Sequence, residues 1–183
     1  MRDADLQDYT SFLNEFQSES DRGAALVGAA WLDEKLMQTL HAFMLKDKTT
    51  DELIVGGMSP LGAFSARAKA AFALGLISKH EFHEIDIVRK VRNEFAHRTH
   101  GTTFKDEKIQ AFCGNLESNT PGPMDDPRSL FINAVVLLQL SLYYRPEYIK
   151  KSNRIRESWA VLAQHAMTQE NKGKPHDLRN LAP

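Results

Sequence analysis

The sequence predicts an all-α protein, a single-domain helical bundle of about six to seven helices. Apolar residues recur at spacings of three and four along most of the chain, which is the pattern of amphipathic helices. No segment combines the apolar and polar alternation of a strand with a hairpin turn. With 183 residues, of which 42% are hydrophobic and 26% charged, the chain is long enough to enclose one core.

Two helices are expected before the pair Gly56 and Gly57, a short one near residues 6–16 and a long one over residues 21–45. Asp21 is expected to cap the long helix, because a side-chain oxygen at that position accepts hydrogen bonds from free backbone N–H groups. Its apolar stripe consists of Leu26, Val27, Ala30, Trp31, Met37, Leu40, Phe43 and Met44. The spacing of this stripe predicts one long amphipathic helix.

The next helix is expected to start at Pro60 and to end near Leu74. Ser59 can cap it, and proline suits the first helical position because its missing N–H would be unpaired there. Gly75 can take the left-handed conformation that ends helices. These signals place both ends of the helix.

Ser78 and Glu81 have the spacing of a capping box and predict a helix over residues 78–98. Further along, Asp126 and Pro127 lead out of a loop into a segment that is apolar nearly all round. We expect that helix to be central to the core. The other expected helices cover residues 106–116 and, after the interruption at Arg145 and Pro146, the stretch to about residue 167.

One domain is expected over residues 1–167, followed by a flexible basic C-terminal tail over residues 168–183. The net charge of −1 provides no global positive field toward nucleic acid or an anionic membrane. The single cysteine, Cys113, excludes an intramolecular disulfide and fits a reducing compartment. Because the chain shows neither a signal peptide nor a membrane-spanning run, we expect a cytoplasmic protein without membrane contact.

The segment 78–100 carries the most informative polar residues. On a helix with about 3.6 residues per turn, Arg92 is expected near the middle of an apolar arc. The arc consists of Phe82, Ile85, Val88, Val91, Phe95 and Ala96. A guanidinium on such a face needs a carboxylate, a polar ligand or a subunit boundary, because an unpaired buried charge is costly. Asn93 lies at the edge of the arc, and His97 shares its side of the helix.

The order of Arg92, Asn93 and His97 resembles the signature of the HEPN superfamily, whose helical domains act on nucleotides and RNA. The resemblance implies metal-independent RNA cleavage at a site shared by two protomers. In that scheme His97 acts as base or acid at the ribose, Arg92 stabilises charge on the phosphate, and Asn93 positions them. The residues alone leave two alternatives open, that Arg92 pairs with an acidic residue and that His97 caps or packs.

A longer stretch, over roughly residues 50–116, resembles the family of mannitol-operon repressor-like proteins. It consists of Ser-Pro-Leu-Gly-Ala-Phe-Ser-Ala-Arg-Ala-Lys-Ala-Ala-Phe-Ala-Leu-Gly-Leu-Ile-Ser from Ser59, then Glu81, Arg-Asn-Glu-Phe-Ala-His from Arg92, and Phe-Lys-Asp from Phe104. The resemblance implies an all-helical regulator of transcription and brings no helix-turn-helix with it. We therefore expect a homodimer that acts through a protein partner, without direct sequence-specific DNA binding.

Three functions follow as hypotheses: regulation of transcription through a protein partner, RNA cleavage of the HEPN type, and sensing of a phosphorylated metabolite or nucleotide. Whether the protein is an enzyme stays open, and RNA is kept as a second class of partner. The candidate residues for binding a ligand or RNA are Arg67, Arg89, Arg92, His97 and His100. Arg67 is either a second phosphate ligand or an ordinary exposed arginine. No cofactor and no metal are expected, because no carboxylate pattern supports the pair His97 and His100.

Overall fold

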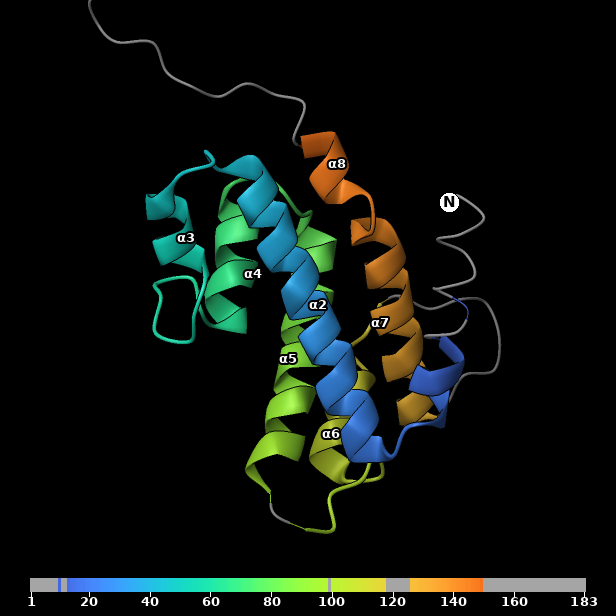
Figure 1. Cartoon of the computed structure of the whole chain (residues 1–183). Helices are drawn as coiled ribbons and strands as arrows, with labels where there is room; N and C mark the ends of the chain where they lie inside the picture. Colours follow the sequence, from blue (N-terminus) through green and yellow to red (C-terminus); the bar gives the residue numbers. More distant parts are fainter. Residues whose placement is uncertain (1–9, 11–12, 99, 118–125, 150–183) are drawn as a thin grey trace, which may run out of the picture. The chain divides into compact units, whose positions relative to one another are not determined.

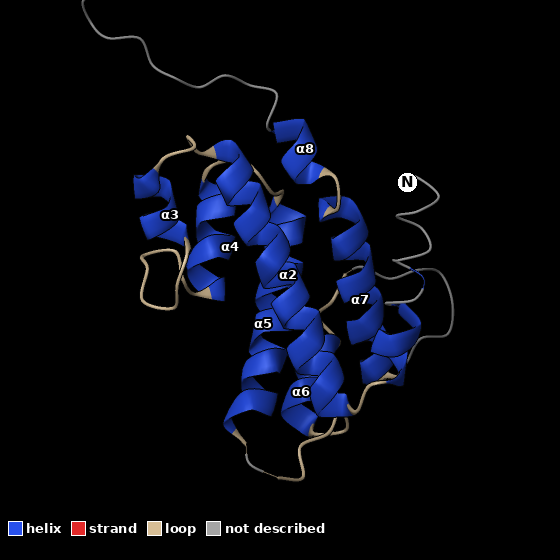
Figure 2. Ribbon diagram, in the orientation of Figure 1, coloured by secondary structure: helices blue, strands red, loops and turns tan. Residues whose placement is uncertain are grey.

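The computed structural model describes residue 10 and residues 13–98, 100–117 and 126–149. Within these residues the chain forms seven named helices, a helical stretch at 13–18 and no strand (Figures 1 and 2). In chain order the helices are α2 (Asp21–Phe43), α3 (Lys48–Ile54), α4 (Phe64–Ala73), α5 (Lys79–His97), α6 (Glu107–Cys113), α7 (Pro127–Leu142) and α8 (Arg145–Ile149). The prediction of an all-α bundle is confirmed. The expected continuation to residue 167 and the tail over residues 168–183 lie outside the described residues.

Helix α2 is the central helix of the described part of the chain. It packs against α3, α4, α5, α7 and α8 (Figure 1). Its N-cap is Ser20, whose Oγ accepts a hydrogen bond from Gly23 N at 3.0 Å, so the prediction of Asp21 as the cap is wrong by one residue. Asp21 instead accepts from the backbone N of Phe104 at 3.1 Å and pairs with Arg128 at 3.0 Å. This carboxylate joins the start of α2 to α7 and to the segment before α6.

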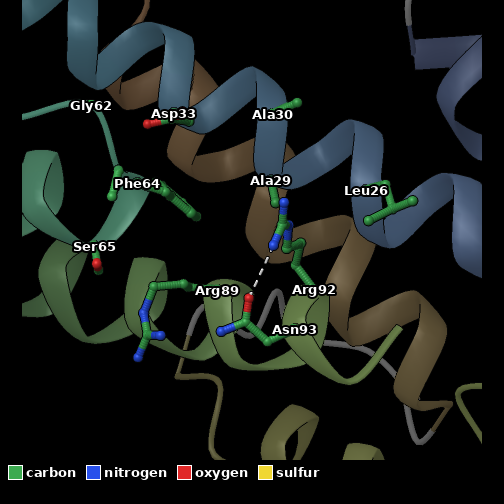
Figure 3. A pocket seen from close by; sticks show the side chains of 11 residues that line it. Leu26, Ala29, Ala30, Asp33, Gly62, Phe64, Ser65, Arg89, Arg92 and Asn93 are labelled. Atoms are coloured by element: carbon green, nitrogen blue, oxygen red, sulfur yellow. Dashed lines mark hydrogen bonds between the residues drawn. The ribbon is translucent and has the colours of Figure 1, made fainter. Parts of the chain in front are cut away.

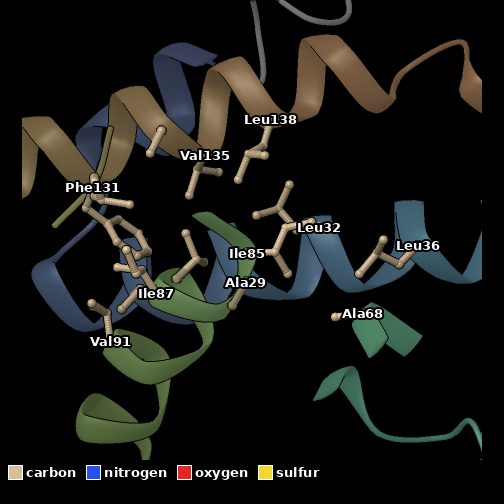
Figure 4. Close-up of a cluster of buried hydrophobic side chains, with 14 of the residues drawn as sticks. Ala29, Leu32, Leu36, Ala68, Ile85, Ile87, Val91, Phe131, Val135 and Leu138 are labelled. Carbon is tan, nitrogen blue, oxygen red and sulfur yellow. The ribbon is translucent and has the colours of Figure 1, made fainter. Parts of the chain in front are cut away.

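The hydrophobic core lies between α2 and the helices around it (Figure 4). Phe95, Phe104 and Phe131 are at most 2% exposed, and their rings follow one another at centroid distances of 5.0 and 5.3 Å. The sequence predicts that α7 is central to the core. The buried residues of α7 lie on one face only, however, and Leu140 on another face is 43% exposed. The central place belongs to α2 because its buried alanines and Gly28 let neighbouring helices approach closely.

Helix α4 begins later than the sequence predicts. Ser59 does not cap it, since the Ser59 Oγ donates to the carbonyl oxygen of Gly56 at 2.7 Å. Gly62 lies so close to this turn that a Cβ at that position would be 2.3 Å from the Gly56 oxygen. The packing holds residues 56–62 in a turn, and α4 starts after it, at Phe64, without a side-chain cap. The short helix α3 before the turn is not among the predicted elements.

Other helix ends follow their local signals. Gly75 has a φ of +68° directly after the end of α4. In the capping box of α5, Ser78 Oγ accepts from Glu81 N at 3.1 Å, and Glu81 Oε2 accepts from Ser78 N at 2.7 Å. Asp126 caps α7, with Pro127 in its first turn. These predictions are confirmed because each signal acts within about four residues of the chain.

Two further findings concern the single cysteine and the apolar length of the helices. Cys113 is fully buried, and burial raises the pKa of its thiol to about 12. A buried thiol with a raised pKa is unreactive, because the thiolate is the reactive form. In the ranges that the structure describes, no helix is long and apolar enough to cross a membrane.

Glu81 contributes a pH-dependent part of the stability. Arg145 donates to both of its carboxylate oxygens at 2.8 Å, and the Glu81 side chain is only 12% exposed. Burial raises the pKa of Glu81, but hydrogen bonds from Arg145, Ser78 and Ser141 outweigh it, so the pKa lies below its ordinary value of 4.5. A carboxylate whose pKa is lowered by folding stabilises the protein above its unfolded pKa. That stabilisation is lost as the pH falls through the folded pKa.

We therefore expect the free energy of unfolding to fall below about pH 4.5. Glu81→Gln is expected to lower it by about 2 kcal/mol near neutral pH, because charge-assisted hydrogen bonds are lost, and to flatten its decrease in acid. Urea unfolding of both proteins over a series of pH values measures this. Glu52→Gln is the control, since the Glu52 side chain is 65% exposed. Equal acid dependence in the Glu81 variant and the parent protein would contradict the prediction.

Candidate functional site

A pocket of about 630 Å³ lies between α2, the start of α4 and the C-terminal half of α5 (Figure 3). It is lined by Leu26, Ala29, Ala30, Asp33, Gly62, Ala63, Phe64, Ser65, Arg89, Arg92 and Asn93. Ala29 and Ala30 have short side chains, which leave space between α2 and α5. Three of the residues singled out in the sequence, Arg89, Arg92 and Asn93, therefore lie in one pocket.

Arg92 is exposed, so the prediction that it lies in the middle of the buried arc is wrong. The buried residues of α5 are Glu81, Glu84, Ile85, Ile87, Val88, Val91 and Phe95. Arg92 lies beside this face and extends toward Ala29 of α2 (Figure 3). Its Nη1 donates to Asn93 Oδ1 at 3.2 Å. No carboxylate within the described ranges forms an ion pair with it, so its charge faces the pocket.

The interpretation of Arg67 as an exposed arginine is wrong. Arg67 does not line this pocket, and its role as a phosphate ligand stays a hypothesis. Its side chain is 9% exposed, and Nη1 donates to Asp33 Oδ2 at 2.7 Å. Its Nη2 donates to the carbonyl oxygen of Ile54 at 3.1 Å. Arg67 of α4 therefore fixes Asp33 of α2 at the edge of the pocket and ties both helices to the end of α3.

Asp33 is a pocket residue that the sequence analysis does not identify. Burial raises the pKa of its carboxyl, and the hydrogen bond and charge of Arg67 together with the charge of Arg92 offset this only in part. The Oδ1 atom is buried and has no hydrogen-bond partner. In the sequence, Asp33 is only a weak signal of a binding site, because the arginine that pairs with it lies on another helix. One carboxylate oxygen at the edge of the pocket therefore lacks a hydrogen bond and is buried from solvent.

Arg89 lines the pocket, but its guanidinium is already engaged. Its Nε and Nη2 donate to Asp86 Oδ1, one turn earlier on α5, at 3.0 and 2.7 Å. In Figure 3 the Arg89 side chain points away from Arg92. Arg92 and Asn93 are therefore the two pocket groups of α5 that are best placed to bind a ligand.

The two candidate histidines do not line this pocket. His97 is the last residue of α5 and is exposed, and His100 is exposed in the loop that follows. The structure thus brings Arg92 and Asn93 together and leaves His97 outside the group that lines the pocket. The RNA-cleavage roles inferred from the HEPN resemblance stay a hypothesis.

The remaining histidines of this region make protein contacts. His80 Nδ1 lies 3.2 Å from Glu117 Oε2, and His83 Nε2 lies 3.2 Å from the carbonyl oxygen of Asn115. Among the described residues, no group of three or more His, Cys, Asp or Glu side chains could hold a metal ion. The arrangement offers a guanidinium, an amide and a carboxylate oxygen, which are groups for binding a polar molecule.

The fold and the pocket define an all-helical bundle with a candidate binding site, in which a guanidinium and an amide of α5 face small residues of α2. The chain belongs to the mannitol repressor family, because the family model MtlR matches residues 31–152. The resemblance inferred from the sequence is thereby confirmed for the family. These comparisons do not show the HEPN resemblance.

Two curated relatives and one solved structure are similar to the chain. The mannitol operon repressors of Escherichia coli K12 and of Escherichia coli O6:H1 are each 29% identical over 79 residues. These matches cover 42% of this chain and 40% of each relative, so the similarity spans less than half of either protein. The X-ray structure of the MtlR-HPr complex from Escherichia coli matches with a TM-score of 0.51 and 22% identity. It covers 78% of this chain and 98% of the matched chain, and this likeness shows a shared fold.

Proposed function

We propose that this chain is a regulator of transcription that acts by binding a protein partner. The observation that carries the proposal is the match to the mannitol repressor family over residues 31–152. A repressor must reach DNA either through its own surface or through another protein. The charges on the helices favour the second route.

The long helices of the described part lack the excess of positive charge that DNA binding requires. Helix α5 carries four basic residues and four acidic ones, and α2 carries two basic and three acidic. A DNA-reading helix is surrounded by cations that replace the counterions of the phosphate backbone. Arg67, one of the two cations of α4, is withdrawn into a buried pair with Asp33. These features support recognition of a protein instead of direct readout of bases.

HPr is the partner that we propose, because the structure of similar fold is an MtlR-HPr complex. We also propose that the chain forms a homodimer. Light scattering coupled to gel filtration measures the dimer directly. The partner is tested by titrating the purified chain with HPr from the same organism in a calorimeter.

We expect HPr to bind saturably. We also expect that the chain alone, at physiological salt, does not shift the DNA upstream of its gene in a gel mobility assay. HPr that has been heat-denatured is the control for nonspecific heat. The proposal is overturned if the chain alone binds that DNA in preference to unrelated DNA, or if HPr produces no saturable signal. Because both measurements use purified components, no unidentified protein can account for the outcome.

A further inference from the structure

We propose that the pocket between α2 and α5 binds a small phosphorylated polyhydroxy molecule, with Arg92 and Asn93 on its phosphate and Asp33 on its hydroxyl groups. The family match and the partner proposal assign no ligand to this pocket. The inference goes beyond the proposed function and does not depend on it. It rests on the charge balance, the unpaired atoms and the size of the pocket.

The charge balance of the pocket favours an anion. Within the described residues, five other arginines form ion pairs with carboxylates, namely Arg67, Arg89, Arg98, Arg128 and Arg145. Around the pocket, Arg67 compensates Asp33 and Asp86 compensates Arg89. Arg92 then remains as the positive charge without an ion-pair partner among these side chains. A guanidinium presents planar N–H donors that match the oxygens of a phosphate group.

Asn93 extends this anion site. Its Oδ1 accepts from Arg92 at 3.2 Å, which orients the amide, and its Nδ2 lies on the side of the amide away from Arg92 (Figure 3). An amide N–H and a guanidinium on adjacent residues can donate to different oxygens of one phosphate. The hydrogen bond between the two side chains therefore preorganises a pair of donors.

Asp33 indicates that the ligand also carries hydroxyl groups. Its Oδ2 is taken by Arg67 at 2.7 Å, whereas its Oδ1 is buried without a partner. A buried acceptor without a hydrogen bond is costly. The Asp33 side chain is 26% exposed, so a small rotation of its carboxylate on ligand binding would bring Oδ1 to a ligand hydroxyl. An anion without a hydroxyl group cannot satisfy this acceptor, because it has no proton to donate and would bring a second negative charge to a carboxylate. The pair of Arg92 and Asp33 in one pocket thus selects a molecule with an anionic end and a hydroxylated end.

The pocket has the size of a small-molecule site. Its volume of about 630 Å³ lies within the range of roughly 300–1,000 Å³ that is typical of such sites. The walls on the α2 side are formed by small residues, Ala29 and Ala30, and Gly62 and Ala63 lie before α4. A sugar or sugar-alcohol phosphate fits this space, whereas a nucleic acid would need a continuous basic surface around it.

Calorimetric titration of the full chain tests the proposal with four probes: inorganic phosphate, free mannitol, mannitol 1-phosphate and glucose 6-phosphate. At least one sugar phosphate is expected to bind saturably and more tightly than inorganic phosphate or free mannitol. Arg92→Gln is expected to weaken this binding at least about tenfold, because a charge-assisted contact is lost. Asn93→Asp should weaken binding by a similar factor, since it places a carboxylate of the same volume beside Arg92, where it competes with the phosphate for the guanidinium. The matched control is Lys90→Gln, which removes one charge from α5 outside the pocket and should leave binding unchanged.

Thermal unfolding of each variant is measured alongside, and Asn93→Asp keeps the test decisive if Arg92→Gln does not fold. The proposal is overturned if neither sugar phosphate binds saturably, or if free mannitol binds as tightly as its phosphate. It is equally overturned if both pocket variants bind like Lys90→Gln. A short RNA is included as a fifth probe. RNA binding that Arg92→Gln abolishes, without binding of either sugar phosphate, would assign the pocket to RNA instead. Loss of HPr binding would leave this result untouched, since the two measurements are independent.

Discussion

Replacing Phe131 by alanine is expected to lower the free energy of unfolding by about 4 kcal/mol. Phe131 is fully buried on α7, and its ring lies 5.3 Å from that of Phe104. The substitution removes apolar burial and leaves a cavity that close-packed helices refill only in part. It also removes one ring from the row of three, in which the Phe104 ring lies 5.0 Å from the Phe95 ring. Urea unfolding followed by circular dichroism measures the loss.

The control for Phe131→Ala lies on the same helix. Leu140 is 43% exposed, so Leu140→Ala should lower the free energy of unfolding by less than about 1 kcal/mol. Equal losses in the two variants would contradict the burial of Phe131 on the core face of α7. A much smaller loss for Phe131→Ala than for other core truncations would contradict the tight packing around its ring.

Replacing Arg67 by methionine is expected to lower the free energy of unfolding by about 3 kcal/mol near neutral pH. Methionine keeps much of the volume but leaves the Asp33 carboxylate, which is 26% exposed, without its nearest cation. Removing one partner of a buried ion pair costs more than the pair itself contributes, because an uncompensated charge remains. The hydrogen bond that Arg67 donates to Ile54 is also lost. Urea unfolding of the variant measures the total loss.

The pH dependence separates this explanation from a simple loss of packing. Without Arg67, the pKa of Asp33, which burial already raises, should rise further. Protonation then relieves the cost, so the deficit of Arg67→Met should shrink as the pH falls. Adding Asp33→Asn should recover part of the loss at neutral pH. Arg89→Gln is the comparison, because its pair with Asp86 lies on one helix and is partly exposed, and should cost less than about 1 kcal/mol. A deficit that does not change with pH would contradict the role assigned to Asp33.

The sequence indicates features that depend on residues close together in the chain. The apolar period predicts the helices, and the capping box of Ser78 and Glu81 places the start of α5. Gly75 marks the end of α4, and Asp126 caps α7. Each of these interactions spans a few residues, so it is present in the sequence before any tertiary contact forms. The family resemblance likewise follows from a continuous stretch of residues.

The composition of the pocket depends on packing between helices. Arg67 and Asp33 are 34 positions apart in the sequence, and the sequence does not show which carboxylate Arg67 meets. Likewise, Arg92 is exposed because the buried face of α5 is set by how that helix meets α2 and α7. The late start of α4 results from the close approach of Gly62 to Gly56, which local capping preferences cannot show.

The sequence by itself therefore determines the helical class, most helix ends and the family. The tertiary structure decides which charges are neutralised and which one faces the pocket. The physical reason is the distance along the chain over which each interaction acts. Helix periodicity and caps are satisfied within about one turn, whereas a buried charge is stabilised by whichever partner the packed helices bring to it.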